Sequence, residues 1–98
     1  MGFREIKARI LAELNSGTGS INHVEREKGK NLLRDERVTL REATAIIGRC
    51  QGTKYAEEKH DSIPGINVHI MKVEIEGKKW YIKFFFIVDK VYFVSFHT

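Results

Sequence analysis

The spacing of apolar residues changes once along the chain. Near the start, apolar residues recur at three- and four-residue intervals with charged residues between them: Phe3, Ile6, Ile10, Leu11 and Leu14. This spacing predicts an amphipathic helix that ends near Gly17. Beyond Gly52 the period becomes two, and β-branched and aromatic residues dominate, which indicates consecutive strands. The pattern predicts one α+β domain over residues 1–98, with N-terminal helices packed on a C-terminal antiparallel sheet of three to four strands.

A second well-marked helix begins after Thr39. Thr39 and Glu42 have the spacing of a capping box, and an apolar stripe follows them to about residue 50. The charged residues 24–33 predict a mostly exposed helix interrupted by Gly29. Residues 17–20, Gly-Thr-Gly-Ser, form the most flexible stretch, and residues 21–24 fit either a short strand or the start of a helix.

The strands are expected at residues 53–59, 66–75, 79–87 and 91–97. In the last two, a register in which paired numbers sum to 178 gathers the apolar residues on one face and leaves a three-residue loop, 88–90. The predicted pairs on this core face are Ile82 with Phe96, Phe84 with Val94, and Phe86 with Tyr92. The same register pairs Tyr81 with His97 and Lys83 with Ser95 on the other, polar face.

The strand at residues 66–75 has a break in its alternation, which predicts a bulge near Ile70 and Met71. A tight turn at residues 77–78 then pairs Ile75 with Trp80 on the core face. Crossing the bulge brings Asn67 and His69 to the polar face. His69 is therefore expected beside Tyr81, Lys83 and His97.

These side chains suit metal-independent RNA cleavage. The reaction needs a base for the 2′-hydroxyl proton, an acid for the leaving 5′-oxygen, and positive charge near the phosphate. Histidine titrates near ~6.5 and can fill either proton role. His97 and His69 are the expected acid and base in unassigned order, with Tyr81 orienting or donating and either Lys83 or Lys54 stabilising the phosphate.

A half-solvated sheet also shows polar residues on its exposed face without any activity. Phe85, Ile87 and Phe93 are expected on that face, where they fit either a patch for a partner protein or a platform for base stacking. The competing interpretation is a noncatalytic module that binds RNA or an acidic protein. No spacing typical of metal ligands occurs, so neither a metal nor a cofactor is expected.

Composition indicates the charge of a binding partner, the redox compartment and the absence of a long apolar segment. Seventeen Lys and Arg against 13 Asp and Glu give a net charge of +4, which favours an anionic partner. A single cysteine, Cys50, fits a reducing compartment such as the cytoplasm. The longest strongly apolar stretch, 84–88, is far shorter than the ~20 residues of a membrane-spanning helix.

The run YIKFFFIVDKVYFVSFHT, with IIG at residues 46–48 and Tyr55 after it, resembles the MqsR family of toxin ribonucleases in the RelE-like and barnase-like group. The resemblance covers roughly the last 55 residues. Tyr81 falls on the family's tyrosine, and His97 stands in place of a lysine after V-S-F. Asn67 or His69 stands near the family's glutamine. Ala56 replaces the lysine that directly follows the family's first-strand tyrosine.

The resemblance implies a bacterial toxin that cleaves messenger RNA without a metal and is held inactive by a cognate antitoxin. It directs attention to residues that would bind RNA around the catalytic group: Lys54, Tyr55, Lys59, Asn67 and Ser95. The oligomeric state, with a homodimer among the alternatives, is left open.

Overall fold

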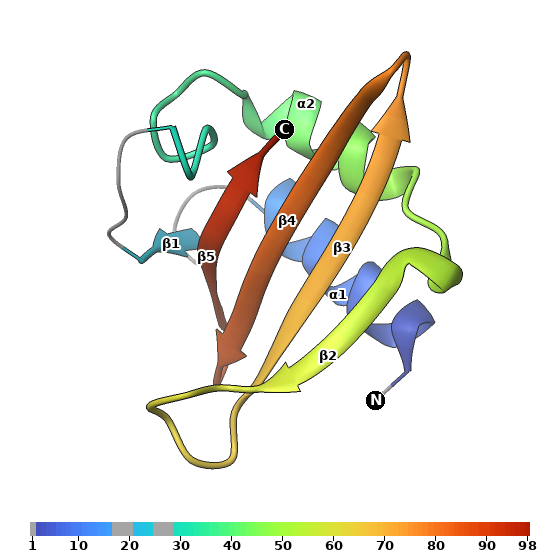
Figure 1. Cartoon of the computed structure of the whole chain (residues 1–98). Helices are drawn as coiled ribbons and strands as arrows, with labels where there is room; N and C mark the ends of the chain where they lie inside the picture. The colour runs from blue at the N-terminus through green and yellow to red at the C-terminus, as the bar shows by residue number, and fades with distance from the viewer. Residues whose placement is uncertain (1, 17–20, 25–28) are drawn as a thin grey trace.

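The computed structural model describes residues 2–16, 21–24 and 29–98, which form two α-helices, a short 3-10 helix and a five-stranded sheet (Figure 1). The elements are α1 (Phe3–Asn15), β1 (Ile21–His23), α2 (Leu40–Gly48), η1 (Gly52–Lys54), β2 (Tyr55–Lys59), β3 (Asn67–Ile75), β4 (Lys78–Ile87) and β5 (Lys90–His97). The strand order is β1-β5-β4-β3-β2, with β1 parallel to β5 and the other neighbours antiparallel. The α+β prediction is confirmed. The prediction of three to four antiparallel strands is wrong, because β1 adds a fifth, parallel strand.

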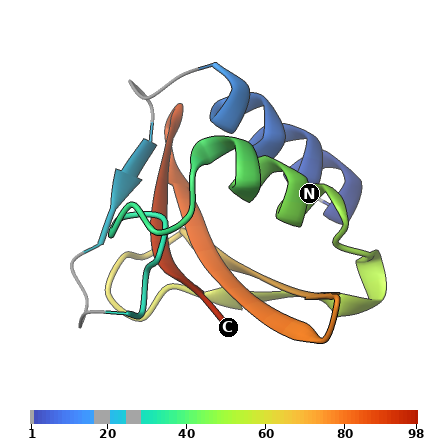
Figure 2. The same cartoon turned by 90° about the horizontal axis from the view of Figure 1, so that it is seen from above.

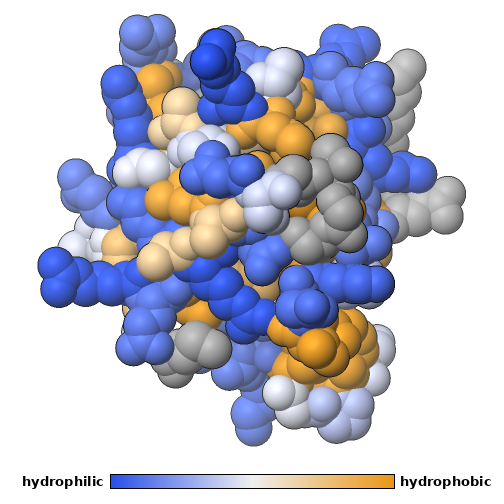
Figure 3. All heavy atoms as spheres, turned by 180° about the vertical axis from the view of Figure 1, so that it is seen from behind, coloured by the Kyte–Doolittle hydropathy of each residue, from blue (hydrophilic) through white to orange (hydrophobic). Residues whose placement is uncertain are grey.

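The two α-helices lie on one side of the sheet only (Figures 1 and 2). We refer to the opposite side as the open face. Seen from the helix side, hydrophilic side chains cover most of the surface, with smaller apolar areas between them (Figure 3). None of the helices in the described segments has the length and apolarity needed to cross a membrane.

Both helices follow the predicted apolar spacing. Helix α1 buries Ile6, Ile10 and Leu14 against the sheet. Helix α2 begins with the predicted capping box, in which the backbone amide of Glu42 donates to Thr39 Oγ1 and the backbone amide of Thr39 donates to Glu42 Oε1, each at 3.1 Å. These bonds satisfy donors that a helix N-terminus otherwise leaves unpaired.

The helix predicted at residues 24–33 is wrong over its described part, since residues 29–33 form a bend, a bridge and turns. Here the backbone pairs with the end of β5: the amide of Leu32 donates to the carbonyl of Phe96 at 2.7 Å, and the amide of Phe96 donates to Lys30 at 2.9 Å. Ile21–His23 form β1, so the segment 21–24, for which a strand and a helix start were both open, contains a short strand. The flexible stretch predicted at residues 17–20 lies outside the described residues.

The β4–β5 register is confirmed at its first three pairs, Tyr81 with His97, Ile82 with Phe96 and Lys83 with Ser95. The register then shifts by one at Val94, which has no partner on β4, so that Phe84 pairs with Phe93 and the predicted pairs of Phe84 and Phe86 are wrong. The turn therefore contains two residues, 88–89, instead of three. Phe93 lies in the core, and Tyr92 moves to the open face with its partner Phe85.

The bulge predicted in β3 is wrong, because β3 pairs with β4 in one unbroken register from Val68 to Ile75. Ile75 is opposite Lys78, and Val73 takes the predicted place of Ile75 opposite Trp80. The alternation breaks for another reason: β3 buries apolar residues on both faces, Val68 and Ile70 on the open face and Met71 and Val73 in the main core.

Candidate active site

Three polar side chains form a row across the open face. Lys72 on β3 is directly opposite Tyr81 on β4, and Tyr81 is directly opposite His97 on β5. Directly opposed residues have Cβ atoms about 5 Å apart. The rings of Tyr81 and His97 stack, with centroids 5.5 Å apart and planes inclined by 27°. We call Lys72, Tyr81 and His97 the polar row.

The contacts of His97 define which nitrogen is available. Its Nδ1 atom lies 3.3 Å from the main-chain oxygen of Thr98. Because that oxygen can only accept, Nδ1 donates in this bond, and the neutral ring leaves its lone pair on Nε2. The His97 side chain thus presents Nε2 as a proton acceptor.

A second cation lies in the adjacent row of the sheet. Lys83 is two residues beyond Tyr81 on the same face of β4, between Ile70 on β3 and Ser95 on β5. The Lys83 residue is partly buried, whereas Ser95 is only 3% exposed. Lys83 is therefore well placed to contact a ligand that lies on Tyr81, while burial of Ser95 disfavours direct contact with RNA.

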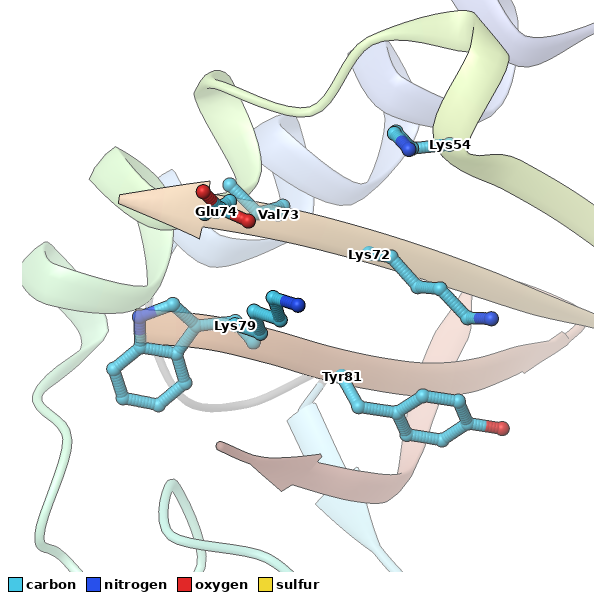
Figure 4. Close-up of a pocket in the computed structure, with 7 residues that line it drawn as sticks. Lys54, Lys72, Val73, Glu74, Lys79 and Tyr81 are labelled. Atoms are coloured by element: carbon cyan, nitrogen blue, oxygen red, sulfur yellow. The ribbon is translucent and has the colours of Figure 1, made fainter. Parts of the chain in front are cut away.

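A hollow of about 340 Å³ adjoins the polar row at Lys72 and Tyr81. Strand β2 pairs with β3 only as far as Met71, and η1 carries Lys54 past the edge that β2 leaves uncovered. Figure 4 shows Lys72 and Tyr81 extending from neighbouring strands in the same direction, with Lys54 beyond β3. The three lysines that line this hollow, Lys54, Lys72 and Lys79, give it a basic wall with Glu74 as the acidic member.

The prediction that His69 and Asn67 lie on the polar face is wrong. Without the β3 bulge, His69 is opposite Phe84, faces the helices and is only 5% exposed. Its Nδ1 atom lies 2.7 Å from Tyr55 Oη and 3.3 Å from Glu57 Oε1. The same carboxylate accepts from Tyr55 Oη at 2.9 Å and, through Oε2, from Asn67 at 3.3 Å. His69 cannot act with His97, because the sheet lies between them.

The surroundings of Tyr55 and His69 favour the neutral form of both side chains. Burial lowers the pKa of His69, the charge of Glu57 opposes that change, and Arg9 adds to it. Burial raises the pKa of the Tyr55 hydroxyl, and the hydrogen bond and charge of Glu57 raise it further. Neutral Tyr55 and His69 therefore join β2 to β3 on the helix side, which takes both residues out of the candidate RNA site.

Lys72 is the site residue that the sequence interpretation missed. The β3–β4 turn decides its partner: Ile75 pairs with Lys78, which places Lys72 opposite Tyr81, whereas the predicted pairing of Ile75 with Trp80 places Lys72 opposite Lys83. Lys59, another predicted contact, lines a separate hollow next to His60 and Phe85. The structure thus brings together Tyr81, Lys83 and His97 as predicted and adds Lys72.

Among the described residues, no group of three or more His, Cys, Asp or Glu side chains could hold a metal ion. The sequence matches no protein-family model, and the search of characterised proteins finds no relative.

Proposed function

We propose that the chain is a metal-independent endoribonuclease that cleaves RNA by attack of a 2′-hydroxyl on the adjacent phosphorus. The observation that carries this proposal is the polar row. A histidine with an available Nε2 atom stacks on a tyrosine, and lysines lie beside that tyrosine on two sides. These groups supply the proton acceptor, the proton donor and the positive charge that the reaction requires.

In the proposed reaction, His97 Nε2 accepts the proton of the 2′-hydroxyl as the 2′-oxygen forms a bond to phosphorus. The bond from phosphorus to the 5′-oxygen breaks, and the Tyr81 hydroxyl donates a proton to that oxygen. Lys72 and Lys83 stabilise the negative charge on the phosphate oxygens as it develops. The products carry a 2′,3′-cyclic phosphate and a 5′-hydroxyl. Exchange with water then removes the added proton from His97 and returns a proton to Tyr81.

The proposed biological setting rests on the resemblance of roughly the last 55 residues to the MqsR family. On that basis we propose a toxin of a bacterial toxin–antitoxin system that acts on messenger RNA in the cytoplasm. A cognate antitoxin would hold it inactive. The net charge of +4 is consistent with an RNA substrate.

A noncatalytic RNA-binding module is the competing function. Stacked Phe85 and Tyr92, with centroids 5.3 Å apart and planes inclined by 8°, lie on the same face as the lysines. Aromatic and basic side chains together also bind single strands without chemistry. The two functions differ in the effect of removing His97, which abolishes catalysis but only weakens binding.

The test is incubation of labelled single-stranded RNA with the protein in excess EDTA, beside His97→Ala and His23→Ala variants that circular dichroism shows to be folded. His23 is the control because it lies on edge strand β1, where its Nδ1 atom is 3.1 Å from Asn31 Nδ2. We expect 2′,3′-cyclic phosphate ends with the parent and His23→Ala, and a loss of about 10²–10⁴-fold in rate with His97→Ala. Intact RNA with all three proteins, or equal cleavage by all three, would overturn the proposal.

A further inference from the structure

A second hollow lies on the open face beyond Lys83, and it has a different chemical character from the polar row. It has a volume of about 280 Å³, near the lower end of small-molecule pockets. Phe85 and Val68, paired across β4 and β3, contribute its apolar lining. The titratable residues around them are Glu58, Lys59, His60, Asp61 and Lys83. We call this site the Phe85 hollow.

Aromatic contacts hold the apolar lining in place. Phe85 is only 3% exposed, stacks in parallel on Tyr92, and meets the His60 ring edge-on with centroids 4.7 Å apart. These contacts on both sides restrict the ring, so the hollow is formed before any ligand binds. A preformed apolar surface of this kind suits a flat ring.

The hydrogen bonds of His60 fix its chemistry. Its Nδ1 atom accepts backbone N–H groups from Ser62 at 3.0 Å and from Ile63 at 3.1 Å. Since both partners are donors, the ring proton lies on Nε2, which makes that nitrogen a hydrogen-bond donor. The carboxylates of Glu58 and Asp61 add acceptors to the same hollow.

The aromatic lining, the His60 donor and the carboxylate acceptors together favour binding of a nucleobase over binding of a phosphate. The two carboxylates balance the charges of Lys59 and Lys83, so the hollow lacks the excess positive charge of the wall beside Tyr81, where three lysines face one carboxylate. A nucleobase has apolar faces for a ring-lined site and an edge with both N–H donors and acceptors. We propose that the Phe85 hollow binds one unpaired nucleobase of the RNA strand whose scissile phosphate lies on the polar row.

The position of the hollow supports this assignment, which rests on the proposed function. Phe85 is four residues beyond Tyr81 on β4, which corresponds to ~13 Å along the strand. Lys83 lies between them on the same face and lines the hollow. A neighbouring nucleotide can therefore place its base in the hollow while Lys83 contacts the backbone. Contacts of this kind determine sequence preference in single-stranded RNA.

The test uses the His97→Ala protein, which should bind RNA without cutting it. A short single-stranded RNA is given one abasic nucleotide at each position in turn, and its affinity is measured by fluorescence anisotropy. We expect one position at which base removal weakens binding about tenfold. Adding His60→Ala or Asp61→Asn should remove most of that penalty, because each variant has lost part of the same site.

The matched control is Glu5→Gln, which neutralises an exposed carboxylate on α1, on the other side of the sheet. It should leave the abasic penalty unchanged. An equal penalty in the His60, Asp61 and Glu5 variants, or no sensitive position, would overturn the assignment. Because binding is measured without cleavage, its outcome is distinguishable from that of the proposed function. If the parent cleaves RNA but the His60 and Asp61 variants keep the full abasic penalty, only the base-binding assignment is refuted. If those variants lose the penalty but the parent cleaves no RNA, only the nuclease proposal is refuted.

Discussion

Replacement of Lys72 by alanine should weaken RNA cleavage, because this exposed lysine lies directly opposite Tyr81. Two unit charges ~4 Å apart interact by about 4 kcal/mol at an effective dielectric constant of ~20. Solvent screening and side-chain entropy reduce an exposed pair to about 1 kcal/mol or less in ground-state binding. A further contribution arises as charge develops on the phosphate. We expect kcat/KM to fall about ten- to a hundredfold, and Lys72→Arg to retain most of the activity.

The assay is kcat/KM for a short RNA at salt concentrations from about 50 to 200 mM, with binding measured in parallel. Loss of one phosphate contact should make the slope of log affinity against log salt shallower by ~0.7. Arg4→Ala is the control, because it removes the same charge from exposed α1 on the helix side. Equal losses in the Lys72 and Arg4 variants would show a general effect of net charge, and an unchanged Lys72→Ala would show that the polar row does not contact RNA. Either result would refute the reasoning.

Three further predictions concern stability. Val88 is 85% exposed and has a φ of 57°, a conformation that strains a β-branched residue. Val88→Asn should therefore raise the free energy of unfolding by about 1 kcal/mol and raise Tm by about 4–8 °C in thermal unfolding. A lower Tm would contradict this. Burial lowers the pKa of His69 in the folded protein, so the His69 ring takes up a proton more readily in the unfolded chain. The free energy of unfolding should therefore fall as pH drops below ~6.5 toward the folded-state pKa. His69→Gln should flatten this part of the curve in urea titrations, and an unchanged slope would assign it to other groups. Thr39→Ala should lower the free energy of unfolding by about 1 kcal/mol, because it removes the hydroxyl that accepts from the backbone amide of Glu42. Thermal unfolding measures this loss, and an unchanged Tm would show that the helix cap contributes nothing.

The elements with local signals were predictable from the sequence. The apolar spacing of α1 and the Thr39–Glu42 capping box each depend on residues close in the chain, and the structure confirms them. The reversal expected at residues 77–78 is present but lies one residue earlier, at Glu76 and Gly77, because Ile75 pairs with Lys78. The strand β1 was ambiguous because its hydrogen bonds come from β5, some 70 residues away. Long-range pairing of a three-residue strand leaves little trace in local periodicity.

The errors at the site come from strands that are apolar on both faces. In β5, Val91 to Val94 are all apolar or aromatic, so alternation does not reveal that Val94 is the bulged residue. In β3, Val68 and Ile70 pack on the open face around Phe85, and this second apolar cluster resembles a bulge in the sequence. The assumed bulge moved His69 to the wrong face, and the predicted pairing of Ile75 with Trp80 placed Lys72 opposite Lys83 instead of Tyr81. The Tyr81–His97 pair was predicted correctly because it lies on the side of the Val94 bulge where the predicted β4–β5 register holds.

The most direct test of the account is a double-mutant cycle in cleavage between Tyr81→Phe and His97→Gln. In the proposed reaction the two stacked side chains divide proton transfer between them and act as one site. Each single variant should then lower the single-turnover rate by orders of magnitude, and the double variant should be little worse than the slower single variant. Losses that multiply, with each variant acting independently, would contradict the claim that Tyr81 and His97 form one catalytic centre.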